Sequence, residues 1–305
     1  MFSTTPFEIP GDGPHSRLAA EAPPAVLAPQ PLAEEQRREV LDFLAVRPLH
    51  TVFMAGLIRD NGVVSPSNRG TFHACRDRAG RFEGVALIGH HTLVEARSEE
   101  AMVAFARFAR HCTLTHLIRG EQEKVELFWR HYAEGARAPR RVCRELLLEQ
   151  RLPAATREEV PGLRPAAPAD IDNVMRVNGA MAFAESGVNP LHSDAEGFRL
   201  RTLRRIEQGR VWLWAEGGRL VFKADIMADT PEAVYLEGVY VRPDERGKGH
   251  GTRCLSQLGR LLLARTRTLC LVVNERHEAA RAFYVNAGFE PRGNYDTIYL
   301  RRASD

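Results

Sequence analysis

The sequence is poor in lysine and has no long apolar run. Of its 42 basic residues only Lys124, Lys223 and Lys248 are lysines, and the 39 acidic residues leave a net charge of +3. A balance so close to neutral argues against the basic surface that non-specific nucleic-acid binding needs. The longest apolar segments, such as 269–273, fall far short of the ~18 residues that span a membrane. We therefore expect neither a nucleic-acid partner nor a membrane partner.

Because lysine is so scarce, arginine carries most of the positive charge. An arginine fork binds phosphate or carboxylate through two parallel hydrogen bonds, so a phosphate-binding protein could use this excess. The arginines are, however, spread evenly along the chain, as a codon bias would spread them. The arginine content therefore identifies no site.

Cysteine is also scarce and indicates neither a disulfide framework nor a metal site. The five cysteines are an odd number, with no C-x-x-C pair and no histidine at metal-ligand spacing. Cys254 and Cys270 lie within apolar patterns, so we expect them to be buried as small hydrophobic side chains. The N-terminus lacks the basic and apolar segments of a secretory signal. We expect reduced thiols, no metal and a cytoplasmic location.

Proline divides the chain into three segments. Seven of the 18 prolines lie within residues 1–31, and proline blocks helices, so we predict an extended arm at 1–30. A second group of prolines at 153–168 marks a boundary between predicted domains at 31–155 and 156–305. Both show a similar order of two helices, several strands, helix, strand, helix, strand. An internal duplication is a hypothesis that this order favours.

The spacing of apolar residues predicts the elements of each half. In the first half we expect helices at 32–44, 52–58, 99–111 and 125–132, and strands at 82–89, 92–96, 114–118 and 144–149. In the second half we expect helices at 170–177, 194–207, 252–265 and 278–286, and strands at 163–165, 211–216, 220–228, 233–241, 268–273 and 297–300.

The most informative segment is 239–252, with the sequence VYVRPDERGKGHGT. A strand is expected to end at Val241, and glycines at 247, 249 and 251 then lead into a helix. Glycine lets a ligand approach the backbone, and a helix N-terminus offers unpaired N–H groups with a partial positive charge. The segment therefore predicts an anion site suited to a pyrophosphate, with Arg246 and Lys248 adding charge. The alternative is a tight turn only, since the spacing is neither a Walker motif nor a dinucleotide motif.

Two linked motifs give this segment a resemblance to the GNAT N-acetyltransferase superfamily. The family loop [QR]-x-x-G-x-[GA] matches 246–251 (RGKGHG), and the family ending [FL]-Y-x-x-x-G-F matches 283–289 (FYVNAGF). The match covers roughly the last 145 residues. It implies a GNAT α/β fold, a mixed and mostly antiparallel sheet flanked by helices. The whole chain resembles tandem GNAT proteins, with a first domain that lacks the CoA loop.

The resemblance implies acetyl-CoA as the donor and no metal. The backbone of Val239 and Val241 would pair with the pantetheine arm, the amides of 247–252 would hold the pyrophosphate, and a divergence between strands 233–241 and 268–273 would admit the thioester. His277 stands where many members have asparagine. The implied cofactor-binding residues are Val239, Tyr240, Val241, Arg246, Gly247, Lys248, Gly249, His250, Gly251, Thr252, Asn274, His277, Ala280 and Phe283.

Acyl transfer to an amine needs a deprotonated amine, a stabilised carbonyl oxygen and a protonated leaving thiolate. Tyr284 matches the family position that protonates the thiolate; the alternative is packing within an apolar helix stripe. The N–H of Val239 is expected to stabilise the oxyanion.

Alternation along the strand places Glu237, Val239 and Val241 on one face, which makes Glu237 the candidate general base. A solvated or salt-bridged carboxylate is the alternative for Glu237. Glu185 and His192 are weaker candidates for contact with the acceptor substrate.

These implications predict an acetyl-CoA-dependent N-acetyltransferase that moves an acetyl group to a primary amine by direct attack on the thioester, beside a catalytically silent first half. The acceptor is a small-molecule amine or a protein amine, and the oligomeric state is open. The alternatives are a non-catalytic acyl-CoA sensor or scaffold, and an acyltransferase with another acyl donor or a protein acceptor.

Overall fold

The structure is a computed structural model that describes residues 27–134, 138–154 and 158–301. Most of the predicted N-terminal arm therefore lies outside the described residues. The position between 155 and 156, where the predicted domains meet, lies outside them as well.

Helices and strands alternate along both halves of the chain. The α-helices are α1 (Arg37–Leu44), α2 (Pro48–Asn61), α3 (Glu99–Ala109), α4 (Gln122–Tyr132), α5 (Ile171–Ser186), α6 (Pro190–Ser193), α7 (Ala195–Glu207), α8 (His250–Leu263) and α9 (Glu278–Asn286). The strands are β1 (Gln30–Pro31), β2 (Gly70–Arg76), β3 (Phe82–Gly89), β4 (His91–Ala96), β5 (Leu117–Glu121), β6 (Pro139–Gln150), β7 (Arg164–Pro165), β8 (Val211–Glu216), β9 (Arg219–Asp229), β10 (Val234–Val241), β11 (Leu269–Asn274) and β12 (Glu290–Leu300). Short 3-10 helices are η1 (Glu34–Gln36), η2 (Pro66–Asn68), η3 (Pro168–Asp170) and η4 (Pro243–Glu245).

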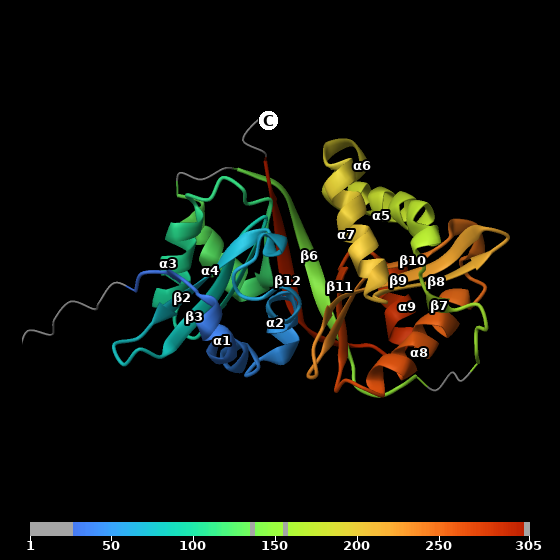
Figure 1. Ribbon diagram of the computed structural model, residues 1–305, viewed down its shortest axis with the longest axis horizontal. Helices are drawn as coiled ribbons and strands as arrows, with labels where there is room; N and C mark the ends of the chain where they lie inside the picture. Colours follow the sequence, from blue (N-terminus) through green and yellow to red (C-terminus); the bar gives the residue numbers. More distant parts are fainter. Residues whose placement is uncertain (1–26, 135–137, 155–157, 302–305) are drawn as a thin grey trace, which may run out of the picture.

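All the described strands join in one sheet, in the order β1-β2-β3-β4-β5-β12-β6-β11-β10-β9-β8-β7. Neighbouring strands are antiparallel except for two pairs, β4 with β5 and β10 with β11. Figure 1 shows one half of the chain on each side, with β6 and β12 between them.

The two halves exchange their last strands. β6 belongs to the first half but pairs with β11 of the second half, from Gln150↔Leu269 to Glu145↔Asn274. β12 ends the second half but pairs with β5 of the first, from Glu121↔Tyr295 to Leu117↔Tyr299. The two exchanged strands also pair with each other. Each half therefore completes the sheet of the other.

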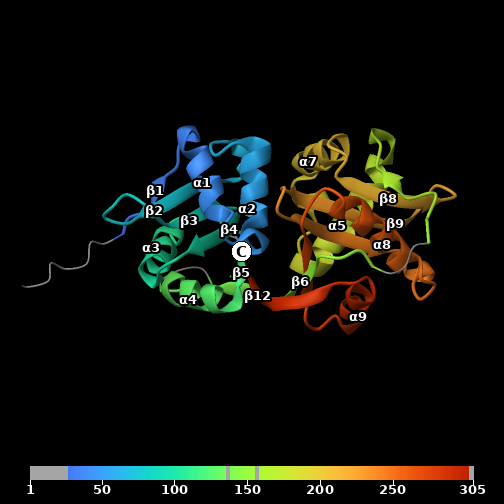
Figure 2. The same cartoon turned by 90° about the horizontal axis from the view of Figure 1, so that it is seen from below.

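Helices cover both faces of the sheet in each half (Figure 2). In the second half α8 packs on one face, over the largest apolar core, and α5 and α7 pack on the other. In the first half α3 and α4 cover one face, while α1 and α2 cover the other. Helix α2 also packs on β9 of the second half, where a Cβ at Gly56 would lie 2.6 Å from the Ala228 Cβ. The backbones of α2 and β9 can approach this closely only because Gly56 has no side chain.

The alternation of helices and strands confirms the α/β prediction, but several strands were predicted wrongly. β2 was not predicted, β5 lies three residues further along than expected, and β6 and β12 are much longer than the predicted 144–149 and 297–300. The first part of β12 contains Pro291, Gly293 and Asn294, which rarely favour a strand. Pairing with β6 holds this segment extended in spite of its composition.

The exchange predicts that a substitution near the C-terminal end destabilises the first half. Ile298 on β12 is 4% exposed within the core that α3 and α4 cover. Replacing Ile298 with alanine should lower the free energy of unfolding by about 2–5 kcal/mol, because a buried cavity remains. Urea denaturation measures this change.

Val142 on β6 provides the matched control, because it is the cross-strand partner of Ile298 and is 54% exposed. Val142→Ala should change the free energy of unfolding by no more than about 0.5 kcal/mol. Equal effects of the two substitutions would contradict the assignment of β12 to the core of the first half.

Candidate active site

The strand β10 carries a bulge in the middle of the second half. Its pairing with β9 joins Glu237 to Asp225 and Tyr240 to Lys223, so two residues of β10 lie opposite one residue of β9. Gly238 lies at this point with a φ of 61°, a conformation that side chains disfavour. The bulge therefore changes the faces to which the following side chains point.

The prediction that Glu237, Val239 and Val241 share a face is wrong. Glu237 pairs with Asp225 and Tyr240 pairs with Lys223, two residues on the same face of β9. Tyr240 packs with the core under α5 and α7. Val239 and Val241 pack instead with the core under α8. The extra residue of the bulge shifts the alternation by one position. Glu237 and the two valines thus lie on opposite sides of the sheet.

A gap opens between β10 and β11. The two parallel strands pair only at Val234↔Leu269 and Tyr235↔Cys270. Beyond these pairs, within the described chain, the edge of β10 that faces β11 has no strand partner. The gap lies between the two strands whose divergence the family resemblance implies. It leaves backbone N–H and C=O groups of β10 available to an extended ligand.

The glycine-rich loop joins β10 to α8. Gly247 and Gly249 have φ values of 76° and 78°, and a Cβ built on either would meet no atom within 4 Å. Gly249 is also the N-cap of α8, and no side chain caps the first N–H groups of this helix. The loop therefore presents uncapped amide groups to open space, as anion binding requires.

Gly251, unlike Gly247 and Gly249, is surrounded by side chains and allows them to pack closely. A Cβ at Gly251 would lie 2.7 Å from Val241 Cγ2 and 2.9 Å from Phe283 Cε2. Ala280, Phe283 and Tyr284 of α9 pack with Val239 and Val241 against one core. The structure thus brings together five of the predicted cofactor residues, Val239, Val241, Gly251, Ala280 and Phe283, whereas Tyr240 packs on the opposite face.

The charged side chains of the loop form ion pairs and hydrogen bonds with neighbouring groups. Lys248 Nζ lies 3.0 Å from Glu245 Oε2, and His250 Nε2 lies 3.4 Å from the same oxygen. Arg246 Nε donates to the carbonyl of Val241 at 3.1 Å. Arg253 Nη2 donates a hydrogen bond to His250 Nδ1 at 2.8 Å. A bound anion would therefore compete with Glu245 for Lys248.

Asn274 and His277 form the turn between β11 and α9. Asn274 Oδ1 accepts the N–H of Arg276 at 3.0 Å, and the N–H of His277 bonds to the Asn274 carbonyl at 3.0 Å. Thr252 lies in the first turn of α8. A cofactor contact of these three residues stays a prediction.

The sequence model described as "Acetyltransferase (GNAT) domain" matches residues 207–291. The matched segment contains β10, the glycine-rich loop, α8, β11 and α9, which together form the gap and the loop. By sequence, residues 207–291 of the second half belong to the GNAT acetyltransferase domain family. No curated protein sequence matches the chain.

Solved structures share the fold over almost the whole chain. A GNAT-family acetyltransferase of Colwellia psychrerythraea is 11% identical with a TM-score of 0.57, over 90% of this chain and 99% of that one. A GCN5-related N-acetyltransferase of Sphaerobacter thermophilus is 14% identical with a TM-score of 0.56, over 90% and 95%. A tandem GNAT protein from the clavulanic acid biosynthesis pathway is also 14% identical, with a TM-score of 0.56 over 89% and 97%. At such low identity these likenesses show the tandem fold and nothing finer.

The first half has a similar gap but no similar loop. β4 and β5 pair only at His91↔Leu117 and Thr92↔Ile118. The Ser98 side chain caps α3 by accepting the N–H of Ala101, and Glu99 and Glu100 occupy the first turn. A capped helix start with two carboxylates repels an anion. The start of α3 therefore differs from the uncapped start of α8 and offers no equivalent anion site.

Acidic residues gather on the face of the sheet that carries Glu237. Glu185, at the end of α5, interacts electrostatically with Glu237, Arg119 and Tyr284. Partial enclosure by the protein, together with repulsion from Glu237, raises the pKa of Glu185 to about 7, although its side chain still reaches solvent. Burial also raises the pKa of Tyr284, so this phenol keeps its proton at neutral pH.

The other predicted acceptor contact, His192, does not join this group. It is exposed on the short helix α6, and in the described chain its side chain contacts none of the acidic residues. Cys254 and Cys270 are fully buried as predicted, and burial raises the pKa of the Cys254 thiol to about 12. No cluster of metal-ligating side chains occurs among the residues that the structure describes. In that part of the chain no helix has the length and apolarity of a membrane span.

Sequence reasoning missed several charged residues beside Glu237. Lys223 and Asp225 of β9 form a buried ion pair, with 2.8 Å between Nζ and Oδ1. Their alternation within an otherwise apolar strand was a signal that could have found them. Arg119 and Glu145 come from β5 and β6 of the first half, and no pattern in the sequence links them to Glu237.

The bulge of β10 gives a testable prediction about Gly238. A Cβ at this position would lie 2.8 Å from Lys223 Nζ and 3.0 Å from Asp225 Oδ2, and the φ is positive. Gly238→Ala should therefore lower the free energy of unfolding by about 2–4 kcal/mol, since backbone strain adds to disturbance of a buried ion pair. Thermal or urea unfolding measures the loss.

Gly217 is the matched control, because its φ is 54° and its Cβ would meet nothing within 4 Å. Gly217→Ala should cost only the strain of a left-handed backbone, about 1–2 kcal/mol. If Gly238→Ala costs no more than Gly217→Ala, the ion pair does not restrict the bulge.

Proposed function

We propose that the protein is an acetyl-CoA-dependent N-acetyltransferase that acetylates a primary amine. The observation that carries this proposal is the gap between β10 and β11, which has the uncapped glycine loop at one end and carboxylates on one face of the sheet. A donor thioester and an acceptor amine can approach this gap from opposite faces.

The donor side is the face under α8 and α9. The amides of Gly247 and Gly249 and the start of α8 would hold the pyrophosphate, because their N–H groups have no side-chain cap. The free edge of β10 beyond Tyr235 would pair with the amide groups of the pantetheine arm. The apolar side chains of Val239, Val241 and Phe283 would pack along that arm.

The acceptor side is the face that carries Glu237. The amine nitrogen forms the new bond to the acetyl carbon, the carbon–sulfur bond breaks, and the nitrogen gives one proton to Glu237. The leaving sulfur takes one proton from the Tyr284 hydroxyl, and exchange with solvent restores both groups. Tyr284 suits this role because its raised pKa keeps it protonated and because, in the described chain, its hydroxyl makes no hydrogen bond.

Glu185 would bind the acceptor as an ammonium ion, which loses one proton to solvent before its nitrogen attacks the thioester and gives the next proton to Glu237. Its carboxyl group ionises near pH 7, so the charge that attracts an ammonium group develops as the pH rises through that value. Protonated Glu185 below pH 7 would bind an ammonium group more weakly.

The test is turnover of acetyl-CoA with a panel of primary amines: n-butylamine, benzylamine, 1,4-diaminobutane and glycinamide, with thiol release as the signal. We expect acetylation of at least one amine, and Tyr284→Phe should lower kcat about 100-fold, the usual scale of a lost general acid. Tyr132→Phe is the control, since its ring is buried in the first-half core under α3 and α4.

Two results of this experiment contradict the proposal. Binding of acetyl-CoA without turnover of any amine would favour a sensor or scaffold. Equal rates for Tyr284→Phe and the wild type would remove Tyr284 from the mechanism.

The glycine loop predicts a specific loss of CoA affinity. In Gly249→Val the side chain would enter the open space where the pyrophosphate is proposed to lie, so CoA should bind at least 10-fold more weakly in calorimetry. Gly209→Val is the matched control, because Gly209 also has a positive φ and open space around its Cβ. Equal affinities of the two variants would reject the loop as the pyrophosphate site.

A further inference from the structure

Arg119 connects the first half of the chain to the proposed base. It lies on β5, and its Nη1 donates to Glu237 Oε1 at 3.4 Å and to the Tyr235 hydroxyl at 3.3 Å, both on β10 of the acetyltransferase domain. Its Nε donates to Thr297 Oγ1 on β12 at 2.8 Å. One guanidinium group thus bonds to the exchanged strand and to the proposed active site.

This contact depends on strong curvature of the sheet. Three strands, β12, β6 and β11, separate β5 from β10. In a flat sheet four steps of about 4.8 Å would separate these two strands by ~19 Å. The sheet therefore curls around α2, and Arg119 and Tyr235 line a cavity of about 60 Å³ with residues of both halves. Arg119 thus lines this cavity and also bonds to Glu237, which is not among the residues that line it.

The charge of Arg119 is secured by two carboxylates. Its side chain is 17% exposed and lies 3.5 Å from Glu145 and 3.4 Å from Glu237. Burial alone would lower the pKa of Arg119, but the carboxylates, Glu145 first, raise it well above its usual value. Thr297 in turn donates to Glu145 Oε2 at 2.6 Å, which fixes the position of that partner. A buried guanidinium with these partners is charged and held in place.

Among the described residues of the acetyltransferase domain, none donates a hydrogen bond to Glu237 as Arg119 does. Lys223 interacts with Glu237 electrostatically, but it is fully buried and lies 2.8 Å from Asp225. The Glu237 side chain is 35% exposed on a bulged strand. Without Arg119 it would have space to adopt several rotamers. Within the described residues, its Oε2 atom accepts no hydrogen bond. Arg119 thus holds one carboxylate oxygen and leaves the other available.

We propose that Arg119 is a positioning residue of the acetyltransferase site: it holds Glu237 Oε1 so that Oε2 faces the acceptor amine and takes its proton. The first half of the chain then completes the active site although it lacks a donor loop. This inference rests on the proposed function and on Glu237 as its base.

The experiment is a double-mutant cycle with Arg119→Lys and Glu237→Gln in the full-length protein. The assay uses acetyl-CoA and the amine of the panel above that the wild type acetylates fastest. Lysine keeps the positive charge, so Glu145 and Glu237 are not left without a cation, but it cannot reach Thr297 and Glu237 together. We expect Arg119→Lys to lower kcat about 10-fold, with KM and the Kd for CoA within about twofold of the wild type.

The cycle distinguishes positioning from a general structural effect. If Arg119 acts through Glu237, Arg119→Lys should change kcat less than twofold in the Glu237→Gln background. Thr297→Val, which removes the acceptor of Arg119 Nε, should lower kcat in the same direction.

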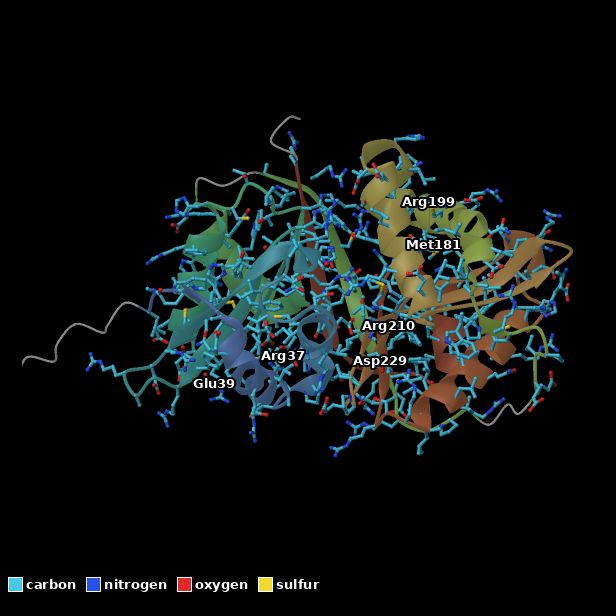
Figure 3. The ribbon with its side chains drawn as sticks, viewed as in Figure 1. Arg37, Glu39, Met181, Arg199, Arg210 and Asp229 are labelled. Carbon is cyan, nitrogen blue, oxygen red and sulfur yellow. The ribbon has the colours of Figure 1, made fainter. Side chains whose placement is uncertain are left out.

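Arg210→Lys is the matched control for contact between the halves. Arg210 and Asp60 form a forked, partly buried ion pair between the two halves, in which Nη2 donates to Oδ1 at 2.7 Å. Figure 3 labels Arg210 where the halves meet. Arg210→Lys should leave kcat within twofold of the wild type.

Each alternative outcome has a distinct meaning. Additive effects of Arg119→Lys and Glu237→Gln, or an equal loss of kcat in Arg210→Lys, would overturn the positioning role and leave the proposed function intact. No turnover of any amine by the wild-type protein would overturn the proposed function, and the role of Arg119 with it.

Discussion

The pairing of β6 with β12 is the constraint on which the rest of the molecule depends. Each strand completes the sheet of the opposite half, so neither half has a full set of strands without the other. The exchange also brings β5 beside β12, and the curvature of the joined sheet then carries Arg119 to β10. The same pairing that closes the fold thus brings residues of both halves to the proposed active site.

A second constraint acts within β10, where one extra residue separates two chemical surfaces. Before the bulge Glu237 faces α5, and after it Val239 and Val241 face α8. A regular strand would place the carboxylate and the two valines on one side, where charge and an apolar pantetheine arm would compete for space. Gly238 permits the bulge because only glycine adopts its φ without strain, beside the buried pair Lys223–Asp225.

Local signals predicted the parts of the site that lie close together in sequence. The glycine loop, the helix after it and the F-Y motif were all placed correctly, because turn residues and helix periodicity act over a few positions. The face of Glu237 was predicted wrongly, since a bulge depends on the partner strand. Arg119 and Glu145 were missed because their approach to Glu237 depends on the exchange of strands, which a chain-order pattern does not contain.

The first half lacks a glycine-rich donor loop and still contributes a residue to the proposed active site. Near its own gap, Lys124 Nζ lies 2.8 Å from Glu95, and Arg47 binds the same carboxylate. A thioester arm in that gap would meet a helix start that carries Glu99 and Glu100. Arg119 lies on β5, next to the strand that carries Glu95, yet it points across the sheet to Glu237. The first half therefore lacks the uncapped helix start of a donor site, but its Arg119 provides the proposed base of the second half with a fixed cation.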